Sequence, residues 1–177
     1  IEHILGRRAA DQPVERDLKI TRQILRVLSD FNNPVGIVTK NHLVTRDIDI
    51  LGDMAKRNLA EVFLSITTLD RDLARTMEPR ASAPHRRLDA IRELAAAGIP
   101  VGVMTAPMIP GLNDHEMEAI LDAAAAAGAT RAGYTALRLP LEIKELFEEW
   151  LRANRPDRAD RVLSLIRQIR GGELYKA

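Results

Sequence analysis

Four short runs of β-forming residues recur along the chain at intervals of about 30 residues, and amphipathic helical stretches separate them. The runs are Val35–Thr39, Val62–Ile66, Val101–Thr105 and Gly133–Leu137. Strands that alternate with helices at this spacing are typical of successive βα units, in which each strand lies parallel to the next. The alternation therefore predicts an α/β fold built on a parallel sheet.

The helical stretches carry their own boundary signals. Apolar residues repeated at helical spacing predict helices from Leu18 to Phe31, Thr45 to Asn58, Pro84 to Gly98 and Asn113 to Gly128. Thr45 and Asn113 are predicted as N-terminal caps, and Glu116 follows Asn113 at the spacing of a capping box. Asn58 and Gly128 are predicted to take the left-handed conformation that closes a helix.

The pattern changes after the fourth run. Leu141–Arg152 and Arg158–Arg170 have the pattern of two helices separated by Pro156, with no strand between them. We therefore predict a C-terminal helical tail that packs on the βα units. Four such units make only half of an eight-fold barrel, and an open sheet would leave two edges to cover. The chain is either a small open α/β fold or part of a barrel whose other strands lie outside these residues.

Composition limits the chemistry. None of the 177 residues is cysteine, which excludes disulfides, a cysteine nucleophile and any cysteine-held zinc or iron–sulfur group within these residues. Twenty-six basic and 25 acidic side chains leave a net charge of +1, so no global field attracts nucleic acid or an acidic membrane. No apolar run approaches the roughly 18 residues that a membrane span needs. We expect a soluble, cytoplasmic protein with no membrane partner.

Several signatures of catalysis are absent from the sequence. It contains no Gly-x-Gly-x-x-Gly, no Gly-x4-Gly-Lys-Ser/Thr and no Gly-x-Ser-x-Gly, which mark dinucleotide, nucleotide-phosphate and serine-nucleophile sites. His115-Glu116 begins like a zinc-binding His-Glu-x-x-His, but Ala119 stands where the second histidine is needed. A surface helix is the better interpretation of this segment.

Polar residues gather where the predicted strands end. Lys40 follows the first run, Ser65 and Thr67 lie at the end of the second, and the third leads into Thr105 and Met108. Barrels and open α/β folds place their sites at the carboxyl ends of parallel strands, so these residues should share one rim. An ammonium group there can bind a carboxylate or a phosphate. The alternative for Lys40 is a solvated loop lysine.

A long loop after the second run concentrates Arg80, Arg86 and Arg87 beside Glu78. This loop is either a charged surface turn with mixed salt bridges or a binding loop. An arginine in the first turn of a helix opposes the helix dipole, which disfavours a purely stabilising role. The Pro110–Asp114 turn is interpreted first as a connection from loop to helix.

Seven ordered segments carry a resemblance to a known family. They are Ile37–Lys40, Val62–Asp70, Met77–Arg80, Arg87–Leu88, Gly98–Val101, Ile109–Asp114 and Arg170–Tyr175. Together they resemble the radical S-adenosylmethionine (radical SAM) superfamily. More narrowly, they are similar to the bacterial proteins related to spore photoproduct lyase that are commonly labelled DNA repair photolyases. The resemblance runs from about Gln12 to the end of the chain.

The resemblance implies a partial (β/α)6 TIM-type barrel and an enzyme that uses S-adenosylmethionine with a [4Fe-4S] cluster. In that family a Cys-x3-Cys-x2-Cys loop holds the cluster, and a reductant such as flavodoxin or ferredoxin supplies the electron. The 5'-deoxyadenosyl radical formed from the cofactor then abstracts hydrogen from the substrate. The branch implies a lyase-like DNA repair activity on an unknown substrate, with nucleic acid as the candidate.

The same resemblance assigns cofactor-binding residues. Lys40 and Ser65 resemble residues that hold the methionine end of the cofactor, and Arg87 resembles the basic residue that completes this polar wall. Thr67, Thr105 and Met108 would lie near the ribose and adenine. The resemblance places no catalytic and no metal-binding residue in this sequence.

The departures from the family lead to further expectations. The cluster loop and two strands of the family have no counterpart here, so we expect additional residues between Ala10 and Asp11 and before Ile1. Residues 1–10 are then a separate piece, residues 11–140 the partial barrel and residues 141–177 the helical extension.

One alternative to a radical SAM enzyme is a non-catalytic half-barrel that binds a small anion or a protein partner. Another is a phosphate-binding barrel enzyme with Lys40 as an amine nucleophile.

Overall fold

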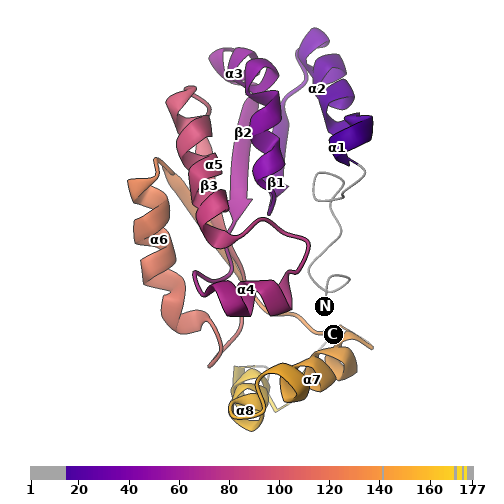
Figure 1. The fold of residues 1–177 in the computed structure, drawn as a ribbon, viewed down its shortest axis with the longest axis vertical. Helices are drawn as coiled ribbons and strands as arrows, with labels where there is room; N and C mark the ends of the chain where they lie inside the picture. The colour runs from indigo at the N-terminus through magenta and orange to yellow at the C-terminus, as the bar shows by residue number, and fades with distance from the viewer. Residues whose placement is uncertain (1–14, 141, 170, 173, 175–177) are drawn as a thin grey trace.

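A four-stranded parallel sheet forms the centre of the chain (Figure 1). The computed structural model describes residues 15–140, 142–169, 171, 172 and 174. The strands β1 (Val35–Thr39), β2 (Ala60–Ser65), β3 (Val101–Met108) and β4 (Arg131–Ala136) lie side by side in chain order. All three neighbouring pairs are parallel. The predicted α/β class with parallel βα units is therefore confirmed.

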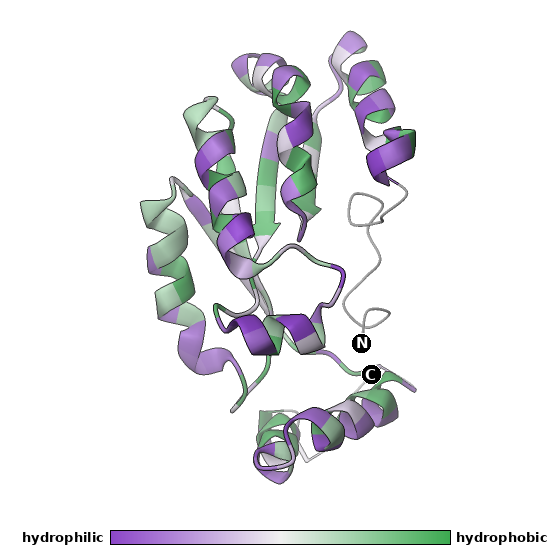
Figure 2. Ribbon diagram, in the orientation of Figure 1, coloured by the Kyte–Doolittle hydropathy of each residue, from purple (hydrophilic) through white to green (hydrophobic). Residues whose placement is uncertain are grey.

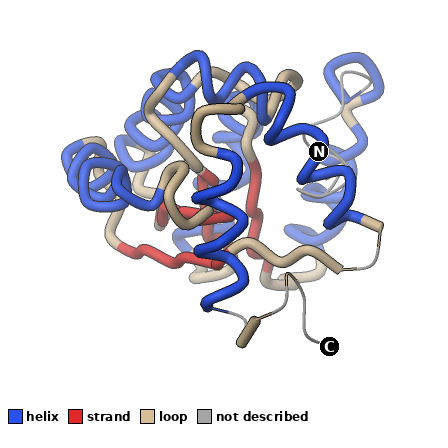
Figure 3. Tube along the Cα trace, turned by 90° about the horizontal axis from the view of Figure 1, so that it is seen from below, coloured by secondary structure: helices blue, strands red, loops and turns tan. Residues whose placement is uncertain are grey.

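Helices cover one face of this sheet and lie along the outside of the curved row of strands (Figure 3). They are α2 (Ile20–Asp30), α3 (Ile48–Lys56), α5 (Pro84–Ala96) and α6 (Met117–Ala126). Alternate strand residues such as Val62 and Leu64 enter the core beneath them, where both are fully buried. The apolar residues of β2 are visible as a green strand behind the helices in Figure 2. Because side chains alternate along a strand, Glu61, Phe63 and Ser65 face the opposite side.

The helices differ from the predicted ones in two of the places compared and agree in a third. A short helix, α4 (Arg71–Met77), lies within the stretch predicted as a long loop, and Asp70 caps it by accepting from the backbone N–H of Asp72 and Leu73. The predicted cap Thr45 instead lies inside a 3-10 helix, η2 (His42–Asp47), whose cap is Asn41. The left-handed conformation predicted for Asn58 is confirmed, with φ of 58°.

The start of α2 is fixed by a preceding turn of helix, α1 (Glu15–Leu18). The buried Glu15 carboxylate accepts from Thr21 N at 3.1 and 3.2 Å and from Arg46 Nη2 at 3.0 Å. This anion satisfies a backbone donor near the helix N-terminus, where negative charge is favoured. The expected break between Ala10 and Asp11 and the separate piece 1–10 lie outside the described residues.

A second core joins the C-terminal helices α7 (Ile143–Asn154) and α8 (Ala159–Ile169) to the carboxyl end of the sheet. Its buried members from the sheet side are Leu73 and Met77 of α4, Ile109 and Leu112 of the loop after β3, and Leu137 and Leu139 after β4. Trp150 Nε1 also donates to Thr76 O at 3.3 Å. The predicted helical tail is therefore confirmed, and it packs against the segments that follow the strands. None of the helices in the described part of the chain has the length and apolar composition that crossing a bilayer requires.

Candidate functional site

The carboxyl ends of the strands point toward α4, with α7 and α8 beyond it (Figure 1). Of the residues predicted at this rim, Ser65, Thr67, Thr105 and Met108 are buried, and the Lys40 side chain is 14% exposed. Backbone register brings the strand ends to one edge, since Thr39 pairs with Leu64 and Ser65 with Met104. The rim predicted from the strand pattern therefore exists as one continuous edge.

A buried ion triad lies at this edge, formed by Lys40, Glu78 and Arg87. Lys40 Nζ lies 2.7 Å from Glu78 Oε1, and Arg87 Nη2 lies 2.6 Å from Glu78 Oε2. The Glu78 side chain is 2% exposed and that of Arg87 is 1% exposed. Two cations surround one anion, so the triad carries a net charge of +1 where water has little access.

Glu78 remains ionised in this setting. Burial alone would raise the pKa of Glu78, but the charges of Arg87 and Lys40 and their hydrogen bonds outweigh burial. The pKa of this carboxyl therefore falls below its ordinary value, and the group is an anion at neutral pH. The sequence analysis did not assign Glu78 to the site. Its position beside three arginines was the available signal, but that pattern is equally typical of a surface turn.

Arg87 uses its donors within the protein. Besides the bond to Glu78, Arg87 Nη1 donates to Ser65 O at 2.9 Å and Nε donates to Ser82 O at 2.6 Å. All three guanidinium nitrogens of Arg87 donate hydrogen bonds within the protein, and the side chain is almost fully buried. The expectation that Arg87 completes the cofactor wall stays a prediction. Arg87 fixes Glu78, the end of β2 and the loop that contains Ser82.

Ser65 and Thr67 differ in their hydrogen bonding. Ser65 Oγ donates to Ala106 O at 3.2 Å and so ties β2 to β3, while its oxygen can still accept a hydrogen bond. Thr67 Oγ1 is fully buried and has no hydrogen-bond partner. A buried hydroxyl without a partner is costly and rare in native proteins. Thr67 therefore presents a polar group that a bound hydroxyl-bearing ligand would satisfy.

Thr105 and Met108 are buried in the C-terminal half of β3. Thr105 Oγ1 donates to Gly133 O at 3.3 Å, which links β3 to β4. Met108 is 4% exposed and belongs to the core under the helices. The Thr105 oxygen can still accept a hydrogen bond, and the assignment of both residues to the ribose and adenine stays a prediction.

Asn113 is a structural link that the sequence analysis assigned to another role. Its Oδ1 accepts from Ile109 N at 2.6 Å, and its Nδ2 donates to Thr67 O at 2.7 Å and to Pro107 O at 3.1 Å. Asn113 is fully buried and makes no side-chain cap hydrogen bond. It therefore holds the loop after β3 against the end of β2, beside the unpartnered hydroxyl of Thr67.

The predicted capping box of Asn113 and Glu116 is wrong. A 3-10 turn, η3 (Asp114–Glu116), precedes α6, and the Glu116 carboxylate reaches across to the other loop. It accepts from Thr68 Oγ1 at 2.5 Å and from Leu69 N at 2.7 Å. Both side chains expected to cap the helix thus join the loops after β2 and β3.

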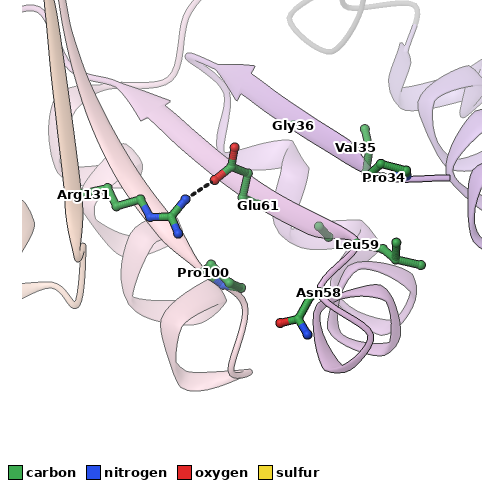
Figure 4. A pocket seen from close by; sticks show the side chains of 9 residues that line it. Pro34, Val35, Gly36, Asn58, Leu59, Glu61, Pro100 and Arg131 are labelled. Atoms are coloured by element: carbon green, nitrogen blue, oxygen red, sulfur yellow. Dashed lines mark hydrogen bonds and ion pairs between the residues drawn. The ribbon is translucent and has the colours of Figure 1, made fainter. Parts of the chain in front are cut away.

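Two hollows open near these elements. One of about 500 Å³ lies between α4 and the start of α5, beside the triad, and Glu78, Arg87, Arg71 and Arg75 are among the residues that line it. The other, of about 320 Å³, opens at the amino ends of the strands, where Arg131 Nη1 pairs with Glu61 Oε2 at 2.5 Å (Figure 4). The second hollow lies at the end of the sheet opposite the rim. Among the described residues, no group of three His, Asp or Glu side chains could hold a metal ion.

Fold and site together define an α/β protein whose parallel strands end beside a buried Lys40–Glu78–Arg87 ion triad. Comparison with known families gives the same placement: residues 5–124 match the radical SAM superfamily. The chain belongs to this superfamily, whose members typically use S-adenosylmethionine and a [4Fe-4S] cluster.

Relatives occur in bacteria, archaea and a virus of archaea. The uncharacterized protein Rv2578c of Mycobacterium tuberculosis is 31% identical over 147 residues, which are 82% of this chain and 43% of that protein. The uncharacterized protein MJ0683 of Methanocaldococcus jannaschii is 36% identical over 107 residues, or 60% and 40% of the two chains. ORF301 of Acidianus two-tailed virus is 39% identical over 74 residues, or 42% and 24%. The chain thus spans less than half the length of these relatives.

Proposed function

We propose that this chain forms the cofactor-holding wall of a radical SAM enzyme and binds the amino-acid end of S-adenosylmethionine. The observation that carries the proposal is the buried Thr67 hydroxyl at the strand ends, which has no hydrogen-bond partner among the described residues and lies at the same edge as Ser65 and the Lys40–Glu78–Arg87 triad. A bound S-adenosylmethionine would bring a ribose hydroxyl to Thr67 and its methionyl carboxylate to the Lys40 end of this edge. The match of residues 5–124 to the superfamily supports the same ligand.

In this proposal each rim residue contacts a different part of the ligand. The Lys40 ammonium binds the carboxylate, and the Ser65 hydroxyl accepts from the methionyl amino group. Thr67 Oγ1, which has no partner in the described part of the chain, hydrogen-bonds a ribose hydroxyl. Donors fixed on strand ends bind with little reorganisation, so the ligand is held in one orientation.

The [4Fe-4S] cluster does not fit the residues of this sequence, because none of the 177 residues is cysteine. In the superfamily, the chemistry that S-adenosylmethionine and the cluster supply is a one-electron cleavage of S-adenosylmethionine, which starts hydrogen abstraction from the substrate. We propose that residues outside this sequence provide the ligands of the cluster. A flavodoxin or ferredoxin is the proposed reductant, in a cytoplasmic enzyme.

The proposed reaction class is lyase-like, with nucleic acid as substrate, as in the photoproduct-lyase branch that the motifs resemble. Exposed Arg71 and Arg75 beside the 500 Å³ hollow support contact with phosphate groups at this end of the sheet. A second function is a non-catalytic module that binds an anion or a protein. The absence of cysteine from the sequence favours that alternative.

Two measurements test the proposal. Anaerobic iron and sulfide analysis of the complete gene product should give about four irons per chain, whereas no iron after reconstitution supports the module. Equilibrium dialysis of S-adenosylmethionine should show weaker binding for Lys40→Ala and Ser65→Ala than for wild type. Affinity unchanged in both variants refutes the assignment of the rim.

A further inference from the structure

The outward side of α2 carries a row of apolar residues that lies open to solvent. Ile20, Ile24, Val27 and Phe31 are 43%, 53%, 56% and 80% exposed. Their spacings of four, three and four residues place them within a sector of about 60° around the helix. These four residues form the α2 stripe. A continuous row of exposed apolar side chains is typical of a surface that another element covers.

Only half of the apolar side of α2 is packed in the described part of the chain. Leu25 is buried, and Leu28 lies against the core under the helices. With the α2 stripe they form one apolar arc of about 160°, compared with the roughly 100° that a single core-facing stripe covers. Helices α3, α5 and α6 each lie between two strands, and among the described residues none of them exposes a large apolar side chain. The wide arc of α2 therefore fits a helix that packs on two neighbours, of which the structure shows one.

Hydrogen bonds on the polar side fix the orientation of α2. Arg22 Nη1 donates to Asp47 Oδ1 at 3.0 Å, and Arg22 Nη2 donates to Asp49 Oδ2 at 2.6 Å. Near the other end of the helix, Arg57 Nη1 donates to Ser29 O at 3.0 Å and Arg57 Nη2 to Ser29 Oγ at 2.7 Å. Turning the α2 stripe toward the core would break these bonds.

The same bonds show which way the stripe points. Asp49 belongs to α3 and Arg57 follows it directly, so Arg22 and Ser29 face that helix. Both residues lie about 180° around α2 from the stripe. The α2 stripe therefore faces away from α3 and from the rest of the row of helices, at the end of the sheet where Figure 1 shows α2 beyond β1.

We propose that the α2 stripe is the docking face for a further βα unit of the same polypeptide, which precedes these 177 residues in the complete gene product. In a run of parallel βα units, the helix between two strands packs back onto the sheet that both strands form. Helix α2 leads into β1, and β1 is the end strand of the described sheet. Helix α2 thus belongs over β1 and over a strand before it. The stripe is the half of its apolar arc that this strand and its own helix would cover.

The length of the relatives supports this occupant. The matched residues are 43% of Rv2578c and 40% of MJ0683, so more than half of each relative lies outside the matched region. A βαβ unit needs only about 30 residues. A parallel strand added at this place would end at the same edge as β1, and docking would extend the rim beside Lys40. The inference holds for an enzyme and for a non-catalytic module alike.

Photo-crosslinking in the complete gene product identifies what covers the α2 stripe. The reporter p-benzoylphenylalanine takes the place of Phe31, an aromatic residue that is 80% exposed, and mass spectrometry identifies the cross-linked peptides after irradiation. We expect a cross-link within one chain, to a peptide that precedes residue 1. The same reporter in place of Leu146, which is 51% exposed on α7, is the matched control and should give no such cross-link.

Every other result at Phe31 overturns the proposal. A cross-link between two copies assigns the stripe to a dimer interface, and a cross-link to another protein assigns it to a partner. A cross-link to a peptide within residues 1–177, no cross-link at all, or a gene product with nothing before residue 1 removes the proposed occupant. None of these results depends on S-adenosylmethionine, so failure of the proposed function leaves this test unchanged.

Thermal unfolding of the complete gene product gives a second measurement. Ile24 and Leu146 are 53% and 51% exposed, so Ile24→Ala and Leu146→Ala are matched in exposure and in secondary structure. At a solvent-exposed helix position, alanine keeps or raises stability, because it is the better helix former. If a βα unit covers Ile24, Ile24→Ala should lower the midpoint by roughly 5–10 °C, whereas Leu146→Ala should shift it by less than about 2 °C. The fall should not depend on protein concentration, since the contact lies within one chain. Equal midpoints for the two variants, or a fall that depends on concentration, contradict the proposal.

Discussion

Replacing Asn113 by alanine should destabilise the protein more than any other single deletion of a polar side chain in the loop after β3. The substitution removes three hydrogen bonds at once, to Ile109 N, Thr67 O and Pro107 O. A buried backbone group left without a partner costs about 1–3 kcal/mol. Water that enters the gap recovers part of this cost. We therefore expect a loss of about 3–4 kcal/mol in the free energy of unfolding.

Urea denaturation followed by circular dichroism measures this loss. The midpoint should fall with the slope unchanged, since the same surface is exposed on unfolding. Asn154→Ala is the control, because Asn154 is partly exposed and its Nδ2 makes a hydrogen bond to Trp150 O within one helix. It should cost less than about 1 kcal/mol. If Asn113→Ala costs no more than Asn154→Ala, the reasoning about the buried link is wrong.

Asn113→Asp keeps the shape of the side chain but changes the hydrogen bonds that the side chain can make. The new carboxylate still accepts from Ile109 N but faces two carbonyl oxygens, Thr67 O and Pro107 O, to which it cannot donate. Only the protonated carboxyl can donate there, so its pKa in the folded state must rise above the unfolded value of about 3.9. The variant should therefore be closest to wild type below about pH 4 and lose stability as the pH rises through the folded-state pKa. A stability difference that does not change between acidic and neutral pH contradicts this account.

Three further outcomes are expected. Gly102→Ala places a methyl group 2.3 Å from Phe63 Cε1, so it should cost about 1–3 kcal/mol, and a double-mutant cycle with Phe63→Ala should abolish most of that cost. Gly111→Ala combines a φ of 75° with a contact at 2.8 Å to Leu165 Cδ1; thermal unfolding should show a loss of about 2 kcal/mol. The hydrogen bond from Arg22 lowers the pKa of Asp49 to about 2, but this carboxylate is 62% exposed. Asp49→Asn should thus cost less than about 1 kcal/mol at neutral pH, and the difference should vanish as the pH falls from about 4 toward 2.

The strands and longer helices could be predicted because their signals are local. A run such as Val101–Thr105 and the helical spacing of Leu88, Ile91 and Leu94 are properties of neighbouring residues. Helix α4 was missed because its seven residues bury only one face, against a partner that lies far along the chain. Its apolar residues are too few to give a helical period by themselves.

The position of the rim could also be predicted from the sequence, but the hydrogen bonds and ion pairs within it could not. The end of a strand is a local feature, so Lys40, Ser65 and Thr67 could be placed at one edge. The roles of Glu78 and Asn113 depend on partners in other loops; Asn113, for example, meets Thr67 across 46 residues of sequence. Asn113 followed by Glu116 is a regular capping pattern, and only tertiary contact shows that both side chains serve the loops instead.

The two cores of the protein meet at the rim, and their packing there explains how the polar side chains of the site keep their positions. Helix α4 places Met77 in the second core and then ends at Glu78, which holds Lys40. The loop after β3 places Leu112 in the same core and then continues to Asn113, which holds Thr67. In both segments the apolar residue is the immediate neighbour of the polar one, so burial against α7 and α8 determines where the polar group lies. The C-terminal helices therefore act on the rim without contributing a side chain to it, because they pack on the two segments that position its charged and hydroxyl groups.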